Sequence, residues 1–240
     1  MELTERLHDY NIDTTTLTLA SYQRPGDAPA YMLRTVAHRA VTTWETLREF
    51  LPDLGYWPII GWDMFKQPPW PEEPTADILA AAALIAGDKW FISDNMASTC
   101  AQELAVMPVS ESHVSAFTFR TPFGRFTNTA PGLTPITLVP CTVPWKVPAF
   151  LRFSEDSNLP EEHVAVQKYW YERWGAELVS WSGAHAELRV ARLPIDAIEA
   201  CHLAVEQDQY CPDLVAQNLG SVASLARILL HSRVWWFWWD

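Results

Sequence analysis

Hydrophobic positions recur at helical spacing in two segments of the first half of the chain. In residues 42–55 they share one face, with Thr42 and Glu45 at capping-box spacing and Pro52 near the end. Residues 75–87 combine a capping threonine with a run of Ala, Leu and Ile that stops at a glycine. The pattern therefore predicts one helix in each segment.

The same spacing predicts three helices in the second half, at residues 160–175, 194–209 and 222–229. The first begins on a proline and ends on a glycine, which are the residues that favour those two positions. The second should bury Ile198, Cys201 and Val205, because these apolar side chains fall near one another on the helix surface.

Runs rich in β-branched and aromatic residues predict the strands. They lie at residues 56–62, 114–121, 136–141 and 148–153, with a hairpin over 176–192. The run VWWFWW at 234–239 differs from them because both of its faces are apolar. Such a strand is typical of the interior of a sheet, since an exposed edge of this kind would aggregate. We therefore expect a central strand here.

The order of these elements predicts an α+β fold. Residues 136–240 should form a mixed sheet of the split β-α-β kind with helices packed on it. Residues 1–135 should form an N-terminal α/β region with a proline-rich excursion at 67–74. Seven prolines between positions 108 and 148 favour a loop-rich connection near residue 135. The same pattern also fits one compact unit that contains both regions.

Charge narrows the range of partners. The chain carries 29 acidic and 17 basic residues, a formal net charge of −12. Nucleic acids and anionic membrane surfaces require clustered Lys and Arg, so neither is expected as a partner. No Lys or Arg occurs between Leu193 and Ala226 or between Gln67 and Asp88. An acidic face built from these stretches would attract a basic protein, although a merely solvated acidic surface explains the same pattern.

The sequence gives no sign of export, membrane insertion or cofactor binding. No apolar run is long enough to cross a bilayer, and the first ten residues lack a signal-like pattern, so we expect a cytoplasmic protein. The four cysteines show no CxxC spacing and should be free thiols or buried small side chains. Glycine-rich phosphate loops and the HExxH motif are absent, and no metal or cofactor is expected.

Acidic and histidine side chains gather over residues 199–213. The E-x-x-H-x-x-x-E spacing brings three of them to one helix flank, where they could hold a metal or transfer protons. A solvated helix flank explains this spacing better than a metal site does, because a carboxylate-bridged site would need a second helix with Glu-x-x-His spacing. The binding residues expected from this segment are Glu199, His202, Glu206, Asp208, Tyr210 and Asp213. No catalytic residue can be assigned among them.

Two further features extend the list of expected binding residues. Asp240 carries a side-chain and a main-chain carboxylate at the end of the aromatic strand, and such charges need solvent or a positive partner. Trp62 and Trp70 lie beside the proline-rich excursion, where their indoles could stack against the ring of a ligand.

Three segments resemble a bacterial family known as domain of unknown function 4253. They are RWGAEL at 173–178, ACHLAVEQDQYCPD at 200–213 and WFWWD at 236–240, and LREFLPDLGYWPII at 47–60 is similar to the segment upstream in that family. The resemblance covers roughly the last hundred residues. It implies a bacterial cytoplasmic domain and names no reaction. It also implies that Glu206, Cys211, Asp213 and the tail belong to a shared framework.

Three functions fit these observations. The first is a non-enzymatic binding protein whose acidic face docks a basic protein, in the manner of an immunity protein that neutralises a toxin. The second is an enzyme or small-ligand-binding domain with a carboxylate and histidine pocket near the last strand. The third is a structural domain that self-associates through its tail. The absence of a complete catalytic motif favours the first.

Overall fold

The structure is a computed structural model of the 240-residue chain. It describes residues 3–20, 26–61, 74–92, 95–107, 133–151, 158–182 and 185–240. Three sequence predictions lie wholly or mostly outside these ranges: the strand at 114–121, the excursion at 67–74, and the stacking role of Trp62 and Trp70.

The described residues form an α+β fold around one mixed sheet, as the sequence predicts. Its seven strands follow the order β1-β2-β4-β3-β5-β6-β7, and β3 pairs with β5 in parallel while every other pair is antiparallel. The strands are β1 (Thr18–Leu19), β2 (Tyr31–Val36), β3 (Trp57–Ile60), β4 (Leu133–Val139), β5 (Glu177–Ser182), β6 (His185–Arg189) and β7 (Val234–Trp238). Strands from both sides of residue 135 therefore share one sheet.

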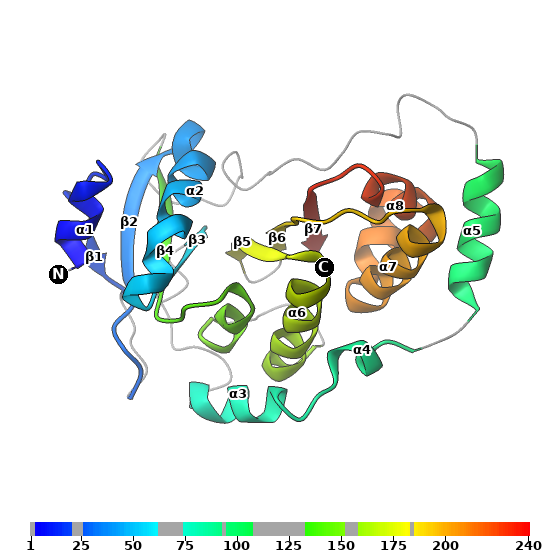
Figure 1. Cartoon of the computed structure of the whole chain (residues 1–240), viewed down its shortest axis with the longest axis horizontal. Coiled ribbons are helices and arrows are strands. Elements are labelled where there is room, and N and C mark those ends of the chain that lie inside the picture. Colours follow the sequence, from blue (N-terminus) through cyan, green and yellow to red (C-terminus); the bar gives the residue numbers. More distant parts are fainter. Residues whose placement is uncertain are drawn as a thin grey trace.

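Helices lie along the sheet and beyond both of its ends. They are α1 (Leu3–Asp9), α2 (Ala40–Phe50), α3 (Thr75–Ala82), α4 (Gly87–Trp90), α5 (Met96–Val106), α6 (Pro160–Trp174), α7 (Ala197–Tyr210) and α8 (Val222–Leu229). Short 3₁₀ turns are η1 (Ala37–Arg39), η2 (Leu51–Leu54) and η5 (Pro144–Ala149), and η6 (Leu214–Leu219) is a π-helical turn. Figure 1 shows α1 beyond β1 at one end of the sheet and α7, α8 and α5 beyond β7 at the other.

Local sequence signals account for the best predicted elements. Helix α6 begins at Pro160 and ends before Gly175, which adopts a left-handed φ of 62°. A side chain at Gly175 would meet the Cβ of Ala191 at 2.8 Å, so glycine is required there. The predicted hairpin is the antiparallel pair β5–β6, and the helix at 222–229 is α8, capped by the side chain of Ser221.

The position of β7 corrects the prediction of a central strand. β7 is the last strand of the sheet that the described residues form, and it pairs with β6 alone. Its Trp235 and Phe237 side chains are nevertheless fully buried, because α6 packs against them through Trp170. In Figure 1 the helices α7 and α8 lie beyond β7, so helices occupy the side on which a further strand would pair. The strand is apolar on both faces without being central.

Several other predictions are also corrected. Residues 148–149 belong to η5 rather than to a strand, since prolines at 144 and 148 remove the amide hydrogens that a strand requires. Ile198 is 52% exposed, because no described element covers the first turn of α7 on that side. Helix α2 begins at Ala40, so Thr42 lies inside it and no capping box forms there. The helix from Thr75 stops at Ala82 and a turn separates it from α4.

The cysteines differ most from expectation. Cys100 in α5 and Cys201 in α7 form a disulfide across 101 positions of sequence. Cys141 and Cys211 are buried and take no part in a disulfide. Among the described residues, no helix combines the length and the apolar character needed to cross a bilayer.

Candidate functional site

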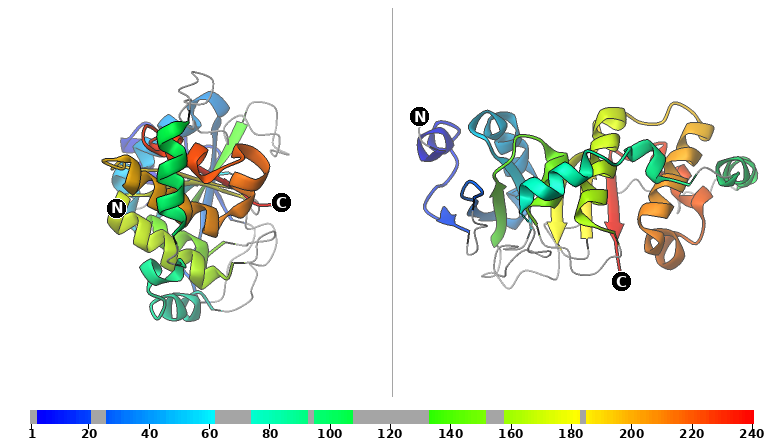
Figure 2. Two further views of the ribbon diagram at one scale, coloured as in Figure 1. Left: turned by 90° about the vertical axis from the view of Figure 1, so that its right-hand side faces the viewer. Right: turned by 90° about the horizontal axis from the view of Figure 1, so that it is seen from below.

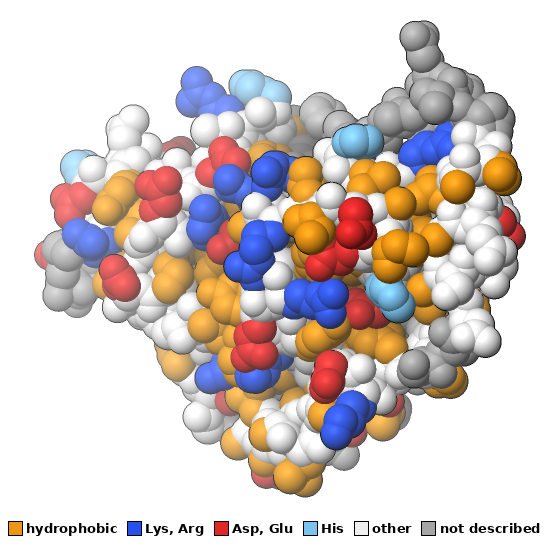
Figure 3. All heavy atoms as spheres, turned by 45° about the vertical axis from the view of Figure 1, so that its right-hand side comes forward, with side chains coloured by type: hydrophobic (Ala, Val, Ile, Leu, Met, Phe, Trp, Pro, Cys, Tyr) orange, Lys and Arg blue, Asp and Glu red, His pale blue; other side chains and the backbone are white. Residues whose placement is uncertain are grey.

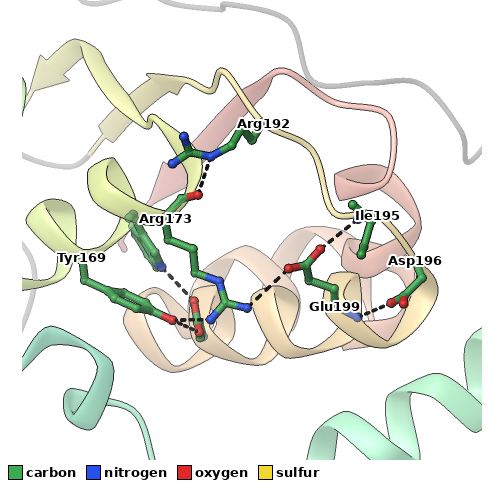
Figure 4. A network of polar contacts seen from close by, with 8 residues as sticks. Tyr169, Arg173, Arg192, Ile195, Asp196 and Glu199 are labelled. Carbon is green, nitrogen blue, oxygen red and sulfur yellow. Dashed lines mark hydrogen bonds and ion pairs between the residues drawn. The ribbon is translucent and has the colours of Figure 1, made fainter.

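A polar network joins the facing sides of α6 and α7 (Figure 4). The Glu206 carboxylate accepts a hydrogen bond at 2.8 Å from the hydroxyl of Tyr169 and another at 2.9 Å from the indole of Trp170. Burial raises the pKa of Glu206, and the two donors and the nearby Arg173 and His202 offset that effect in part. Burial, together with the Glu206 carboxylate, raises the pKa of Tyr169 to about 12. Tyr169 therefore stays protonated and serves as a donor.

Arg173 extends this network toward the start of α7. Its Nη1 donates to the hydroxyl of Tyr169 at 3.0 Å, and its Nη2 lies 3.5 Å from Glu199 Oε1. The other Glu199 oxygen accepts from the backbone N–H of Ile195 at 2.9 Å, while Asp196 accepts from the backbone N–H of Glu199 at 2.8 Å. This reciprocal arrangement caps α7, so both acids have structural roles.

A second polar cluster lies in the core, between α6 and the end of α7. The hydroxyl of Tyr210 and Nδ1 of His163 lie 2.5 Å apart, and Gln167 Nε2 donates to the same hydroxyl at 3.5 Å. All three side chains are at most 2% exposed. The rings of Trp181 and Trp239 stand against His163 at 5.6 and 6.0 Å. The cluster therefore fixes α6 to the end of α7 from within the core.

The tail is held against the turn that follows α7. The backbone N–H of Asp240 donates to Oδ2 of Asp213 at 3.0 Å, and the thiol of Cys211 donates to the carbonyl of Trp238 at 3.0 Å. The other oxygen of Asp213 accepts from Gln217 at 2.9 Å. Asp213 thus positions the tail, while the Asp240 side chain is exposed.

The structure brings some of the predicted binding residues together and separates others. Glu199 and Glu206 meet through Arg173, and Asp213 meets Asp240. Tyr210 faces the core, and His202 is exposed. Asp208 is half-buried, and burial raises its pKa. Within the part of the chain that the structure describes, no three His, Cys, Asp or Glu side chains are grouped as a metal site requires.

Two surface hollows lie elsewhere. The first, of about 720 Å³, lies between α3 and α6 and is lined by Trp145, Lys146 and Lys168 among others. The second, of about 690 Å³, lies where α2, α6 and the ends of β5, β6 and β7 meet. We call it the arginine cleft, because its lining includes Arg48, Arg189, Arg192 and Arg233. None of the acidic, histidine and tyrosine residues that the sequence predicted as binding residues lines either hollow.

One end of the molecule exposes apolar and acidic side chains together. We define the α5–α7 surface as Met96, Glu103 and Val106 of α5 with Ile195, Asp196 and Ile198 at the start of α7; all six are exposed. The disulfide between Cys100 and Cys201 holds the two helices together. Figure 2 shows α5 crossing in front of the helices at this end.

Sequence reasoning missed the arginine cleft and the network partners of Glu206. The four arginines come from α2, from the end of β6 and the loop after it, and from the residue before β7. Because these segments are far apart in the sequence, no local sequence pattern predicts the cleft. The cap at the start of α7 could have been found, because Asp196 and Glu199 stand at capping-box spacing.

A comparison with known protein families finds a match in the second half of the chain. Residues 135–240 match the model of the family described as domain of unknown function (DUF4253). This confirms the resemblance expected from the tail and from the YCPD turn. The description of the family names no activity. No curated protein and no solved structure matches the chain.

Proposed function

We propose that this chain is a non-enzymatic binding protein whose α5–α7 surface docks a basic protein partner. An immunity protein that neutralises a toxin acts in this manner. This is the function that the sequence favours because no complete catalytic motif is present, and the α5–α7 surface is the place on the molecule that we assign to it.

The observation that carries the proposal is the exposure of apolar side chains at this end. Ile195 is 89% exposed, Val106 83% and Ile198 52%, although large aliphatic side chains are usually buried. Exposed apolar groups with charged residues beside them are typical of a protein interface. Glu103 and Asp196 supply the charge here.

The charge of the surface selects a basic partner. Neither α5 nor the stretch from Leu193 to Ala226 contains Lys or Arg. The formal net charge of −12 adds long-range attraction for a cation-rich protein. Asp196 caps α7 through one carboxylate oxygen and is nevertheless exposed, whereas Glu199 and Glu206 are partly buried, so Asp196 is the more accessible charge of this helix.

Affinity capture with charge-reversal variants tests the proposal. A partner isolated with the wild-type chain should be purified and its affinity measured at about 50 and 300 mM salt, since screening weakens exposed charge pairs. Glu103→Lys should weaken binding, and Ile195→Asp should remove an apolar contact. Asp196→Lys should also weaken binding, and because it removes the cap of α7, thermal melting must show that this variant folds. Asp53→Lys is the matched control, because Asp53 is exposed in η2, outside the α5–α7 surface. Affinity that is independent of salt, or equal losses in the control, would refute the proposal.

The alternative of a carboxylate and histidine pocket near the last strand receives less support. Glu206 and Asp213 hold other parts of the chain in place, and Tyr210 bonds to His163 in the core. These contacts explain the residues without a ligand. Self-association through the tail is tested by size-exclusion chromatography of the wild-type chain, in which a dimer or larger species would elute ahead of the monomer.

The proposal includes a cytoplasmic location, as the sequence predicts. The disulfide between Cys100 and Cys201 is the observation that argues against it, since disulfides are rare in reducing compartments. Cell fractionation, combined with alkylation of free thiols before lysis, would decide between a reducing cytoplasmic location and an oxidising compartment.

A further inference from the structure

The arginine cleft concentrates positive charge on a protein with a formal net charge of −12. Four of its lining residues are arginines, and Glu172 and Glu177 are the acidic ones. Basic side chains gather in the middle of the face that Figure 3 shows, with acidic side chains among them. The net charge of the cleft therefore depends on which of the arginines form ion pairs with carboxylates.

Two of the four arginines have carboxylate partners. Arg48 lies 3.1 Å from Glu177, and Arg189 lies 3.2 Å from Glu45. The remaining lining carboxylate, Glu172, is paired at 2.7 Å with Lys168. Among the described residues, neither Arg192 nor Arg233 forms an ion pair with a carboxylate.

Backbone carbonyl groups hold these two arginines in place. Arg192 donates from Nε to the carbonyl of Arg173 and from Nη2 to that of Glu172, both at 2.6 Å. Arg233 donates from Nη1 to the carbonyl of Ala191 at 2.6 Å. A carbonyl is neutral, so each guanidinium keeps its full charge and further N–H groups. The end of α6 offsets only about half a charge.

The close packing around Arg192 makes this arrangement rigid. The backbone amides of Ala191 and Arg192 both donate to the carbonyl of Trp174, at 3.1 and 3.0 Å. Gly175 sits directly against Ala191, with no room for a side chain. The backbone N–H and the guanidinium of Arg192 are therefore both hydrogen-bonded to the last turn of α6. A guanidinium held in this way loses little conformational freedom when a ligand binds.

We propose that the arginine cleft binds a small organic anion through Arg192 and Arg233. Two uncompensated guanidinium groups match a ligand with two negative charges, carried by phosphate or carboxylate oxygens, and both groups suit the planar fork of arginine. The cleft volume of about 690 Å³ is within the range of small-molecule sites. Tyr171 in its lining offers a ring for the organic part of the ligand. This site is separate from the α5–α7 surface and does not depend on the proposed function.

Calorimetric titration of the full chain with simple anions tests this inference. Pyrophosphate and succinate are the two probes, added in a low-salt buffer that contains neither phosphate nor carboxylate. We expect saturable binding of at least one probe at one site per chain. Preferential binding of pyrophosphate would identify phosphate as the recognised group, and preferential binding of succinate would identify carboxylate.

Variants then locate the binding. Arg233→Gln and Arg192→Gln should each weaken the affinity about tenfold, because each removes a charge-assisted contact. Arg39→Gln is the matched control, since it removes the same charge from an exposed position in η1, and its affinity should stay within about twofold of the wild type. Because Arg192 also caps α6, thermal melting must show that its variant folds, while Arg233→Gln tests the site independently. No saturable binding of either probe, or equal weakening by Arg39→Gln, would overturn the proposal.

Discussion

Reduction of the disulfide between Cys100 and Cys201 should destabilise the protein strongly. Helix α5 fully buries only the small side chains of Ala97 and Cys100, with Ala101 and Leu104 partly buried against the core, and each buried methylene-sized group contributes about 0.8 kcal/mol. The packing of α5 alone therefore contributes little. The cross-link spans 101 positions, and the loop-entropy relation gives about 4.7 kcal/mol for a loop of this size at 25 °C. That is a large part of the roughly 5–15 kcal/mol typical of a whole domain.

Urea unfolding of the oxidised and the reduced protein measures this contribution. The reduced protein keeps both buried thiols and loses only the constraint on the unfolded chain, so its unfolding midpoint should fall by on the order of 1–2 M. Reductant should have no further effect on a variant with both Cys100→Ala and Cys201→Ala, because Cys141 and Cys211 form no disulfide. Thiol titration of the unreduced, denatured protein should find two thiols. Four thiols, or identical midpoints, would refute the reasoning.

Three smaller changes test the interior. Tyr210→Phe leaves Nδ1 of the buried His163 without its hydroxyl partner and should lower the free energy of unfolding in urea by about 1–3 kcal/mol; an unchanged midpoint contradicts this. Because burial raises the pKa of Glu206 above its ordinary value of 4.5, its stabilising contribution is complete below that value and is lost as pH rises through the folded pKa. The stability of the wild type relative to Glu206→Gln should therefore fall between pH 4 and 7 in urea titrations, and a constant difference would refute the assignment. Gly175→Ala forces a left-handed φ on alanine and a Cβ contact of 2.8 Å with Ala191, so thermal unfolding should show a loss of at least about 1 kcal/mol, and an unchanged midpoint would contradict the geometry.

Elements with local signals could be predicted from the sequence. Pro160 and Gly175 bound α6 because each residue imposes the backbone angle that its position needs. Helical periodicity also places His163 and Trp170 on one side of α6, and the structure buries both residues. These features depend on neighbours within a few positions of each other.

The order of the strands could not be predicted in the same way. β3, at residues 57–60, lies between β4 and β5, and only contacts between distant segments decide this. The sequence shows that both faces of β7 are apolar. It does not show that helices, rather than another strand, lie beyond the free side of β7. Periodicity shows which residues share a face and does not show what covers it.

The same limit applies to the candidate sites. The spacing within α7 gives Glu206 as a candidate binding residue, but it does not show the hydrogen bonds from Tyr169 and Trp170, because those partners lie on another helix. The arginine cleft needs four separate segments, and each isolated arginine looks like an ordinary surface residue. The exposed Ile198 was expected in the core, since a periodic pattern does not reveal where the covering element ends.

The place of β3 in the sheet also bears on how this chain should be shortened for expression. The family match covers residues 135–240, yet the strand between the first two strands of that segment comes from residues 57–60. A fragment cut at the family limits would lose Trp57, whose indole donates to the carbonyl of Leu178 at 2.9 Å, and would leave β5 with one uncovered side. β4 and β5 would then lack the strand that separates them, and the fragment should aggregate during expression. Functional assays of this protein should therefore use the chain with its upstream residues.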